Sequence, residues 1–405
     1  MSNSTASLER IRPKARLLSF PDHKDLISCG IDPDALPYLV PKLGHRVILL
    51  RDIRLFAANI IKQTMLSIGG DAAVHRSVIT GKVEYSDCII MGDLRHYKNL
   101  IEKLENQPNM SEIAIIINEH LNIKKTPLRL KLCSNNLEWE KRPLVMGIVN
   151  VTPDSFSDGG LYAEPETAIA HAHELISQGA GIIDVGGEST RPGAAPIDEK
   201  SEIKRVLPVI KGIVLNADVP ISMDTRNAAV AEAAIGAGAS IINDVSSMTH
   251  DPEMIFLAKR TGAGIVLMHM RGMPAEMQNN TCYRDVVSEI YDYLEDRVKV
   301  CLEAGIDPLS IIIDPGIGFG KDLEGNLSLI KHIQEFSSLG LPVMLGHSRK
   351  SFIGKVLDSK VQDREEGTDA VTSWAAIQQV DIVRVHNVKR AKKTIEMINS
   401  ILKSR

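Results

Sequence analysis

Residues 143–160 read PLVMGIVNVTPDSFSDGG, and the pattern of this stretch recurs along the chain. Its first half is an apolar, β-branched run from Leu144 to Val149, which is typical of a strand buried on both faces. The run stops at the polar Asn150 and continues into a segment of Thr, Pro, Asp, Ser and Gly, which predicts a loop. A buried strand that ends in a polar side chain and a loop presents functional groups at one edge of a sheet.

Strand and helix signals alternate eight times from Leu144 onward. The expected strands are residues 144–149, 182–185, 220–223, 240–244, 264–269, 311–314, 342–346 and 381–385. The expected helices are residues 165–178, 199–215, 227–237, 251–261, 284–304, 323–338, 367–379 and 388–402. Eight such units in about 260 residues match the size of a closed β/α (TIM) barrel. A doubly wound open sheet is the alternative.

A polar group at the C-terminal end of every strand favours the barrel over the open sheet, which gathers such groups near one switch point. These groups are Asn150, Asp184, Asp224, Asn243 with Asp244, His269, Asp314, Ser348–Lys350, and Arg384 with His386.

Residues 1–121 predict a separate small α/β domain, and the polar segment 122–127 (NIKKTP) predicts a linker. The apolar runs Val47–Leu50, Cys88–Met91 and Ile113–Ile117 suit buried strands. Residues 55–68 and 94–104 have the periodicity and end signals of helices. Scattered surface charges explain the polar residues of this domain as well as a site would, so its sequence assigns it no function.

Residues 128–405 form the predicted barrel domain. Just before its first strand, Leu128–Cys133 and Leu137–Trp139 flank Ser134–Asn136, which predicts a β-hairpin that would cover the bottom of the barrel.

The composition excludes several classes of protein. A net charge of −4 argues against a general nucleic-acid binder. The five cysteines contain no C-x-x-C pair, which favours reduced thiols in a cytoplasmic protein over disulfides or a zinc site. The first residues lack the apolar core of a secretory signal, and no apolar run approaches the roughly 18 residues of a membrane span. We therefore expect a soluble protein that binds neither nucleic acid nor a membrane.

The strand ends predict the chemistry of a ligand. Asp224, Asn243 and Asp314 offer acceptors that suit a flat heterocycle with adjacent N–H and amino donors, and Lys350 could donate to a ring carbonyl. Each aspartate taken alone is more often a helix cap or a turn former.

A basic group at the last two strand ends predicts an anion site. Arg384 and His386 alternate along the last strand and so share a face, and Ser348–Ser351 precede a helix. Barrels commonly bind phosphate at this position. A solvated basic turn is the alternative.

The glycine-rich stretch DPGIGFGK (314–321) is not a dinucleotide fingerprint, because the final G-x-x-G spacing is missing. Its glycines, Gly318 among them, would let the backbone approach a flat ligand beside the apolar wall of Phe319. His269 is explained as a core histidine.

Eight motifs are spread in order over the predicted barrel: GIVNVTPDSFSDGG (147–160), ESTRPGA (188–194), SMDT (222–225), INDV (242–245), LMHMRG (267–272), DPGIGFGK (314–321), GHSRKSFIG (346–354) and VRVHNV (383–388). Together they closely resemble the dihydropteroate synthase family, from about Leu128 to the C-terminus. The resemblance implies a pterin-binding barrel and a transferase of folate biosynthesis. Such an enzyme condenses p-aminobenzoate with 6-hydroxymethyl-7,8-dihydropterin diphosphate and releases pyrophosphate.

The resemblance also implies a role for each matching residue. Asn150 would ligate Mg²⁺ held with the diphosphate, and Arg384, His386 and Thr190 would meet the diphosphate with it. The pterin would be held by Asp224, Asn243, Asp314 and Lys350, with Met268 lining its pocket. The p-aminobenzoate site would be bounded by Pro192, Phe319, Lys350 and Ser351. The loops 154–160 and 189–194 would close over the reacting centre, and their residues Asp154, Asp158 and Arg191 would join Lys350 in catalysis.

Two departures from the family pattern are His347, where a smaller or apolar residue is expected, and Asn387, where Asp is usual. The family's barrels also imply a homodimer. One rival interpretation is a methyltetrahydrofolate methyltransferase on the same barrel, which would not need the basic residues 348–350, Arg384 and His386. The other is a non-catalytic pterin-binding or scaffold protein whose working part is the first 120 residues.

Overall fold

The computed structural model describes residues 23–29, 31–121, 128–133, 135–140, 143–151, 165–188, 197–272, 277 and 280–404. The chain divides into two compact units, Met1–Ile123 (unit 1) and Lys124–Arg405 (unit 2). The expected linker 122–127 and the loops 154–160 and 189–194 lie outside the described residues.

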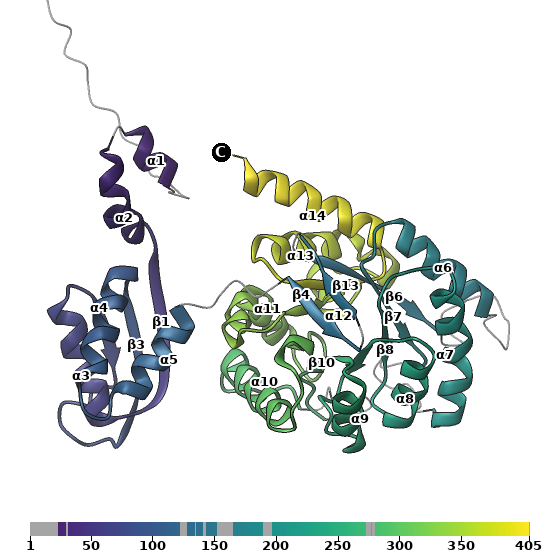
Figure 1. The fold of residues 1–405 in the computed structure, drawn as a ribbon, viewed down its shortest axis with the longest axis horizontal. Helices are drawn as coiled ribbons and strands as arrows, with labels where there is room; N and C mark the ends of the chain where they lie inside the picture. Colours follow the sequence, from purple (N-terminus) through teal and green to yellow (C-terminus); the bar gives the residue numbers. More distant parts are fainter. Residues whose placement is uncertain are drawn as a thin grey trace, which may run out of the picture. The chain divides into compact units, whose positions relative to one another are not determined.

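Unit 2 is an eight-stranded parallel barrel (Figure 1). Its strands are β6 (Leu144–Asn150), β7 (Ile182–Gly186), β8 (Ile221–Asp224), β9 (Ile241–Asp244), β10 (Gly264–Met268), β11 (Ile311–Asp314), β12 (Met344–Gly346) and β13 (Ile382–Val385). They pair in the order β11-β10-β9-β8-β7-β6-β13-β12. A parallel bridge between Ile313 and Val343 joins the two ends of this order, so the sheet closes on itself. The expected barrel is confirmed, and the open-sheet alternative is wrong.

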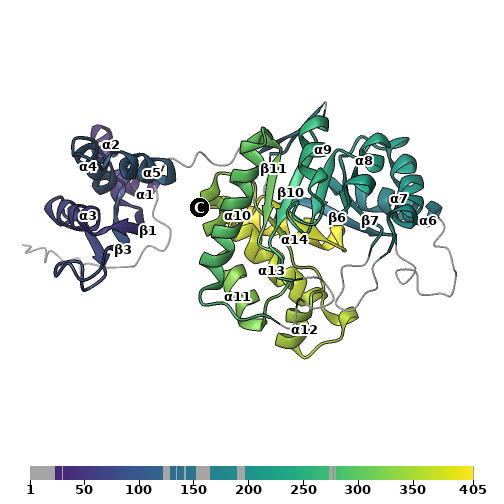
Figure 2. The ribbon, with the colours of Figure 1, turned by 90° about the horizontal axis from the view of Figure 1, so that it is seen from below.

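Helices surround the strands (Figures 1 and 2). They are α6 (Pro165–Ser177), α7 (Glu199–Val214), α8 (Ala228–Gly236), α9 (Glu253–Thr261), α10 (Val286–Glu303), α11 (Leu323–Lys331), α12 (Ser351–Leu357), α13 (Glu365–Ile377) and α14 (Val388–Lys403). The helix expected after Ser348–Ser351 is α12, although residues 351–357 were not among the expected helix ranges because seven residues are too few to display a helical period. The expected helix 323–338 is in fact α11 followed by a 3₁₀ segment, Ile333–Leu339.

The barrel has two apolar layers because side chains alternate along each strand. Residues such as Ile183, Val185 and Val383 belong to the core that also contains the helix residues. The alternate residues, which include Met146, Ile182 and Ile382, form a second core inside the barrel.

The hairpin of β4 (Arg129–Leu132) and β5 (Asn135–Glu138) closes the N-terminal end of the barrel. Its residues Leu130, Leu132 and Trp139 belong to the inner core, together with residues near the start of the strands. Burying each such leucine contributes about 1.5–3 kcal/mol. The expected hairpin and its position at the bottom are confirmed.

Unit 1 is a three-stranded antiparallel sheet with helices. The strands β1 (His45–Arg54), β2 (Asp71–Val74) and β3 (Tyr85–Asp93) pair in the order β1-β3-β2. The core contains residues from α3 (Leu55–Ser67), α4 (Leu94–Glu105) and α5 (Ser111–Leu121). The short helices α1 (His23–Ser28) and α2 (Leu36–Leu39) and the 3₁₀ segments Pro33–Ala35 and Val40–Lys42 precede β1.

The expected strand Ile113–Ile117 is wrong, because these residues lie in α5. Ala114 and Ile117, three residues apart, are fully buried, whereas Ile115 and Ile116 are exposed. The run therefore has one buried helical face, and packing against α4 overrides the preference of isoleucine for strands.

Candidate active site

The polar residues of the barrel interior gather at the C-terminal end of the strands. Ile182, Ile241, Ile312 and Ile382 belong to the inner core, and two residues further along the same strands stand Asp184, Asn243, Asp314 and Arg384. Since side chains two apart point the same way, each of these polar groups faces the barrel interior above an isoleucine. The same pattern on these strands thus builds the expected ring of functional groups: an isoleucine in the inner core is followed, two residues nearer the C-terminal end, by a polar side chain.

Arg384 is the centre of this ring. Its Nε donates to Oδ2 of Asp184 at 2.6 Å, and its Nη2 donates to Oδ2 of Asp224 at 2.8 Å. Nδ2 of Asn243 lies 3.3 Å from both carboxylate oxygens of Asp184. Residues from β13, β7, β8 and β9 therefore form one connected network.

Burial controls the electrostatics of this network. Burial raises the pKa of Asp224 to about 7, although Arg384 opposes the shift. Burial alone would lower the pKa of Arg384, but Asp184 and Asp224 together raise it above its usual value. Arg384 is therefore a permanent cation.

Sequence reasoning gave Asp184 no role and gave Arg384 only an anion to bind. In the structure Asp184 is fully buried and paired with Arg384. A signal existed, because Asp184 shares its strand face with the core residue Ile182, and a carboxylate inside a barrel needs a partner.

Asp314 and Lys350 lie beside the network, and their opposite charges attract each other. Oδ1 of Asp314 accepts a hydrogen bond from the backbone N–H of Gly316 at 2.7 Å. Burial raises the pKa of Asp314 and lowers that of Lys350 to about 8, and each charge opposes the shift of the other. A Cβ added at Gly346 would lie 3.7 Å from Oδ2 of Asp314 and 3.9 Å from Nζ of Lys350, so the glycine keeps this space open.

Lys350 also contacts the loop that follows β11. Its Nζ donates to the carbonyl oxygen of Ile317 and lies 4.5 Å from the centroid of the Phe319 ring. A Cβ added at Gly318, whose φ is +88°, would lie 3.2 Å from Cδ of Lys350. The glycine-rich loop therefore lies directly against the lysine.

The ends of β12 and β13 are joined by Ser348 and His386. The Ser348 hydroxyl lies 2.9 Å from Nδ1 of His386 and accepts from its backbone N–H at 3.3 Å. The next residues of the first segment lead to α12, with Lys350 at the N-cap and Ser351 as the first helical residue. The expected basic group is thus assembled from both strand ends.

The two departures from the family pattern have local partners. His347 is fully buried, and its Nε2 lies 2.9 Å from the hydroxyl of Thr372 on α13. Asn387 caps α14 by accepting from the backbone N–H of Arg390 at 3.1 Å.

Asn150 ends β6 next to this network. A Cβ added at Gly186 would lie 3.8 Å from Oδ1 of Asn150 and also 3.8 Å from Oδ2 of Asp224. The described candidate residues lie at this end of the barrel: Asn150, Asp224, Asn243, Met268, Asp314, Gly318, Phe319, Lys350, Ser351, Arg384 and His386. The other candidates, Asp154, Asp158, Thr190, Arg191 and Pro192, lie outside the described residues.

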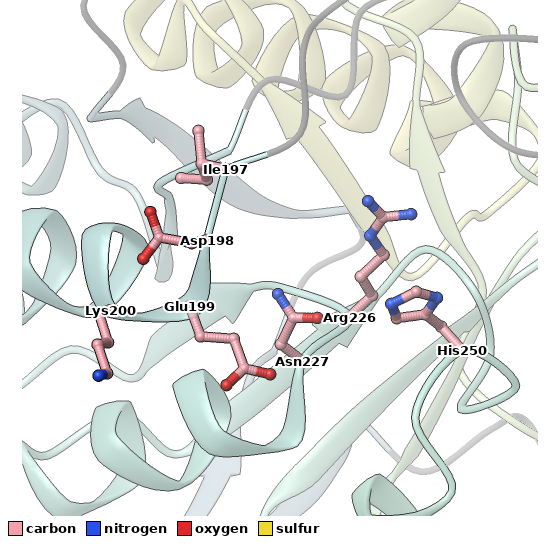
Figure 3. Close-up of a pocket in the computed structure, with 7 residues that line it drawn as sticks. All are labelled: Ile197, Asp198, Glu199, Lys200, Arg226, Asn227 and His250. Carbon is pink, nitrogen blue, oxygen red and sulfur yellow. The ribbon is translucent and has the colours of Figure 1, made fainter.

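Figure 3 shows a further pocket, which has a volume of about 550 Å³. It is lined by Ile197, Asp198, Glu199, Lys200, Arg226, Asn227 and His250. Nη2 of Arg226 forms an ion pair with Glu188 at 3.3 Å. None of the candidate residues lines this pocket, so we assign the substrates to the ring.

Comparison with known proteins agrees with this geometry. Residues 146–386 match the family model for pterin binding enzymes. The dihydropteroate synthase of Bacillus subtilis is 47% identical over 266 residues, which cover 66% of this chain and 91% of that protein. A crystal structure of the Yersinia pestis dihydropteroate synthase with a sulfonamide drug superposes with a TM-score of 0.65 at 40% identity, over 68% of this chain and all of that one. The chain therefore belongs to the pterin-binding enzymes.

The similarity also identifies the group of pterin-binding enzymes to which the chain belongs. A dihydropteroate synthase from Xanthomonas albilineans in complex with 7,8-dihydropteroate superposes with a TM-score of 0.62 at 36% identity, over 68% of this chain and all of that one. Within the pterin-binding enzymes, the chain therefore belongs to the dihydropteroate synthases, which are transferases.

Some relatives also match part of unit 1. A probable bifunctional folylpolyglutamate synthase/dihydropteroate synthase of Halobacterium salinarum is 41% identical over 373 residues, or 91% of this chain and 44% of that protein. Because unit 2 begins only at Lys124, this match extends well into unit 1.

No described helix is long and apolar enough to cross a membrane.

Proposed function

We propose that this chain condenses 6-hydroxymethyl-7,8-dihydropterin diphosphate with p-aminobenzoate to give 7,8-dihydropteroate and pyrophosphate. The observation that carries the proposal is the set of the buried Asn243 and Asp314 with the half-buried Asp224 and Lys350 at one end of a barrel of this family.

The geometry supports a pterin in this set. Nδ2 of Asn243 is directed to Asp184, which leaves its amide oxygen as an acceptor for the ligand. Oδ1 of Asp314 is occupied by Gly316, which leaves Oδ2, the oxygen near Lys350 and Gly346. Carboxylate and amide acceptors beside a lysine donor match the amino group, ring N–H and carbonyl of a pterin.

The bond that breaks joins the pterin methylene to the diphosphate, and its electron pair leaves with pyrophosphate. The electron-rich ring delocalises the resulting cation, and the carboxylates of Asp224 and Asp314 stabilise positive charge on it. Arg384 and His386 favour the departing anion. The neutral amine of p-aminobenzoate then forms the C–N bond and releases a proton, so no strong general base is needed.

A Mg²⁺ ion held with the diphosphate fits the residues at the end of β6. The described residues contain no group of three or more His, Cys, Asp or Glu side chains that could hold a metal ion. The half-buried Asn150 offers one amide oxygen, which suits Mg²⁺ bound mainly by substrate phosphates and water. The chemistry that the bound ion would supply is partial neutralisation of the diphosphate.

We further propose a homodimer in the cytoplasm. Apolar side chains are exposed on the adjacent helices α13 and α14: Trp374 and Ile377 on the first, Met397 and Ile401 on the second. The spacings of three and four residues place each pair on one helix face. Sedimentation should give a dimer for the native chain and a monomer for Met397→Glu with Ile401→Glu; a native monomer would exclude the dimer.

The function is tested by measuring pyrophosphate release from the dihydropterin diphosphate. Release should depend on p-aminobenzoate and Mg²⁺, and it should be strongly reduced in Lys350→Met. Methyl transfer from methyltetrahydrofolate, or release that does not require p-aminobenzoate, would contradict the proposal.

A further inference from the structure

The loop from Pro315 to Gly320 is held unusually close to the segment that follows β10. Gly316, Gly318 and Gly320 have φ values of +71°, +88° and +66°, a region that favours glycine. A Cβ added at Gly316 would lie 2.0 Å from the carbonyl oxygen of His269, and one at Gly320 would lie 2.7 Å from that of Arg271. Only glycine allows this approach, so the loop conformation is built into the sequence.

Lys321, the residue after this loop, turns back beneath it and is almost completely buried. Its Nζ lies 2.8 Å from the carbonyl oxygen of Gly316, 2.9 Å from that of Phe319 and 3.1 Å from that of His269. Nδ1 of His269 lies 3.0 Å from the same nitrogen. Four acceptors therefore surround one ammonium group, and three of them are backbone carbonyls.

No carboxylate of a described residue lies within 4 Å of this ammonium, so it is not half of a direct ion pair. Burial lowers the pKa of Lys321, and the more distant Asp314 opposes that shift. A buried cation is costly to the fold, and an apolar side chain would fill the same space at less cost. The loop carbonyls that it binds are the feature that accounts for a lysine here.

The same loop is bound from its other side by the candidate site. Its residue Gly316 donates to Asp314, Ile317 accepts from Lys350, and the ring of Phe319 lies under Lys350. Lys321 and Lys350 thus hold alternate parts of one loop, the first from within the barrel domain and the second from the substrate side.

We propose that Lys321 is a positioning residue of the pterin site, which fixes loop 315–320 so that Asp314, Phe319 and Lys350 meet the ligand in one arrangement. This inference rests on the proposed function. Lys321 itself touches no predicted substrate group and acts through the loop.

His269 completes the anchor as an acceptor. Because a lysine ammonium can only donate, we assign the ring proton of His269 to Nε2, which leaves the lone pair of Nδ1 as the acceptor. Burial, with Lys321 and Arg271, lowers the pKa of His269 to about 2, so the ring stays neutral at working pH. The ring is packed edge-on against Tyr293, with centroids 4.9 Å apart.

The experiment compares Lys321→Met with Lys331→Met, the same change at an exposed position on α11. In the full-length Lys321→Met protein, the KM for the dihydropterin diphosphate should rise about tenfold while kcat at saturation stays within about threefold, because binding must now order the loop. Backbone hydrogen exchange of Gly316, Gly318 and Phe319 should become faster without ligand. Lys331→Met should change neither quantity.

A second pair of variants covers the case in which Lys321→Met does not fold. Oδ1 of asparagine can replace Nδ1 of histidine as an acceptor, whereas leucine cannot. His269→Leu should therefore raise the same KM and the same exchange rates several-fold, and His269→Asn should restore both towards the native values.

The outcomes separate this inference from the proposed function. Native exchange rates and native KM in folded Lys321→Met, or equal behaviour of the two His269 variants, would overturn the positioning role, even with a lower Tm. A native protein without synthase activity would overturn the proposed function, while the exchange rates would still report whether Lys321 holds the loop.

Discussion

The two units of this chain differ in what they bury. Among its described residues, unit 1 buries few polar side chains, and two of them have local explanations: Asp93 caps α4, and Ser86 binds the backbone of His75 and Asp87. Unit 2 buries Asp184, Asn243, Asp314 and Lys321 at one end of its barrel, at a cost that folding alone does not require. Buried charge without a structural need marks the functional region, and it occurs in unit 2.

The largest effect on unit 2 should follow from removing Arg384. Arg384→Met leaves the carboxylates of Asp184 and Asp224 buried without their cation, which should destabilise the barrel by about 3–5 kcal/mol. Chemical denaturation measures this loss, with Lys393→Met at an exposed position of α14 as the control.

The loss should depend on pH. The pKa of Asp224 is raised from 3.8 to about 7, so its protonation stabilises the fold at low pH, and this contribution is lost as the pH rises through that range. Without Arg384 the ionised carboxylate is disfavoured further, so the destabilisation should be greater at pH 8 than at pH 5. If Arg384→Met lost the same free energy of unfolding at pH 5 and at pH 8, the interaction of Arg384 with the carboxylate of Asp224 would be contradicted.

The next largest effect should be on ligand binding. Asp314→Asn keeps the acceptor for Gly316 but points an amide donor at the donors of the pterin. Calorimetry should show a loss of pterin affinity of about 2–4 kcal/mol, or roughly thirty-fold to a thousand-fold. Asp307→Asn, at the other end of β11, is the control. A variant that binds normally but melts at a much lower temperature would make Asp314 a structural residue.

The sequence predicted the strands and the residues at their ends because both follow from local patterns. Asp224, Asn243 and Asp314 each end a run of apolar residues, so their position on the rim could be read directly. The partners of Arg384 could not be predicted in this way, because Asp184 is 200 positions away in the sequence. Whether Arg384 binds a phosphate or a carboxylate depends on which residues the closed barrel brings next to it.

The contacts of Lys321 and His269 were also out of reach of the sequence. They exist because loop 315–320 folds back over the end of β10, and no periodicity encodes that return. In unit 1, α5 was predicted as a strand because its four isoleucines favour strands. The helix forms because packing against α4 buries one of its faces, and this packing cannot be read from the local sequence.

A smaller effect should appear in the pH dependence of pterin binding. Burial lowers the pKa of Lys350 to about 8, so its ammonium loses its proton as the pH rises above that value. Affinity for the unreactive dihydropterin alcohol should fall about tenfold between pH 7.5 and 9.5. Lys350→Arg should bind more weakly but with little dependence on pH over this range; an unchanged fall in that variant would assign the titration to another group.

The smallest effect is expected from removing unit 1, and this truncation tests the central claim that the barrel holds the whole active site. We predict that residues 128–405 release pyrophosphate in a p-aminobenzoate-dependent reaction with a kcat/KM within about threefold of the full chain. A fragment that folds, as judged by circular dichroism and melting, but has no turnover while the full chain is active would contradict the claim and place unit 1 in the catalytic unit.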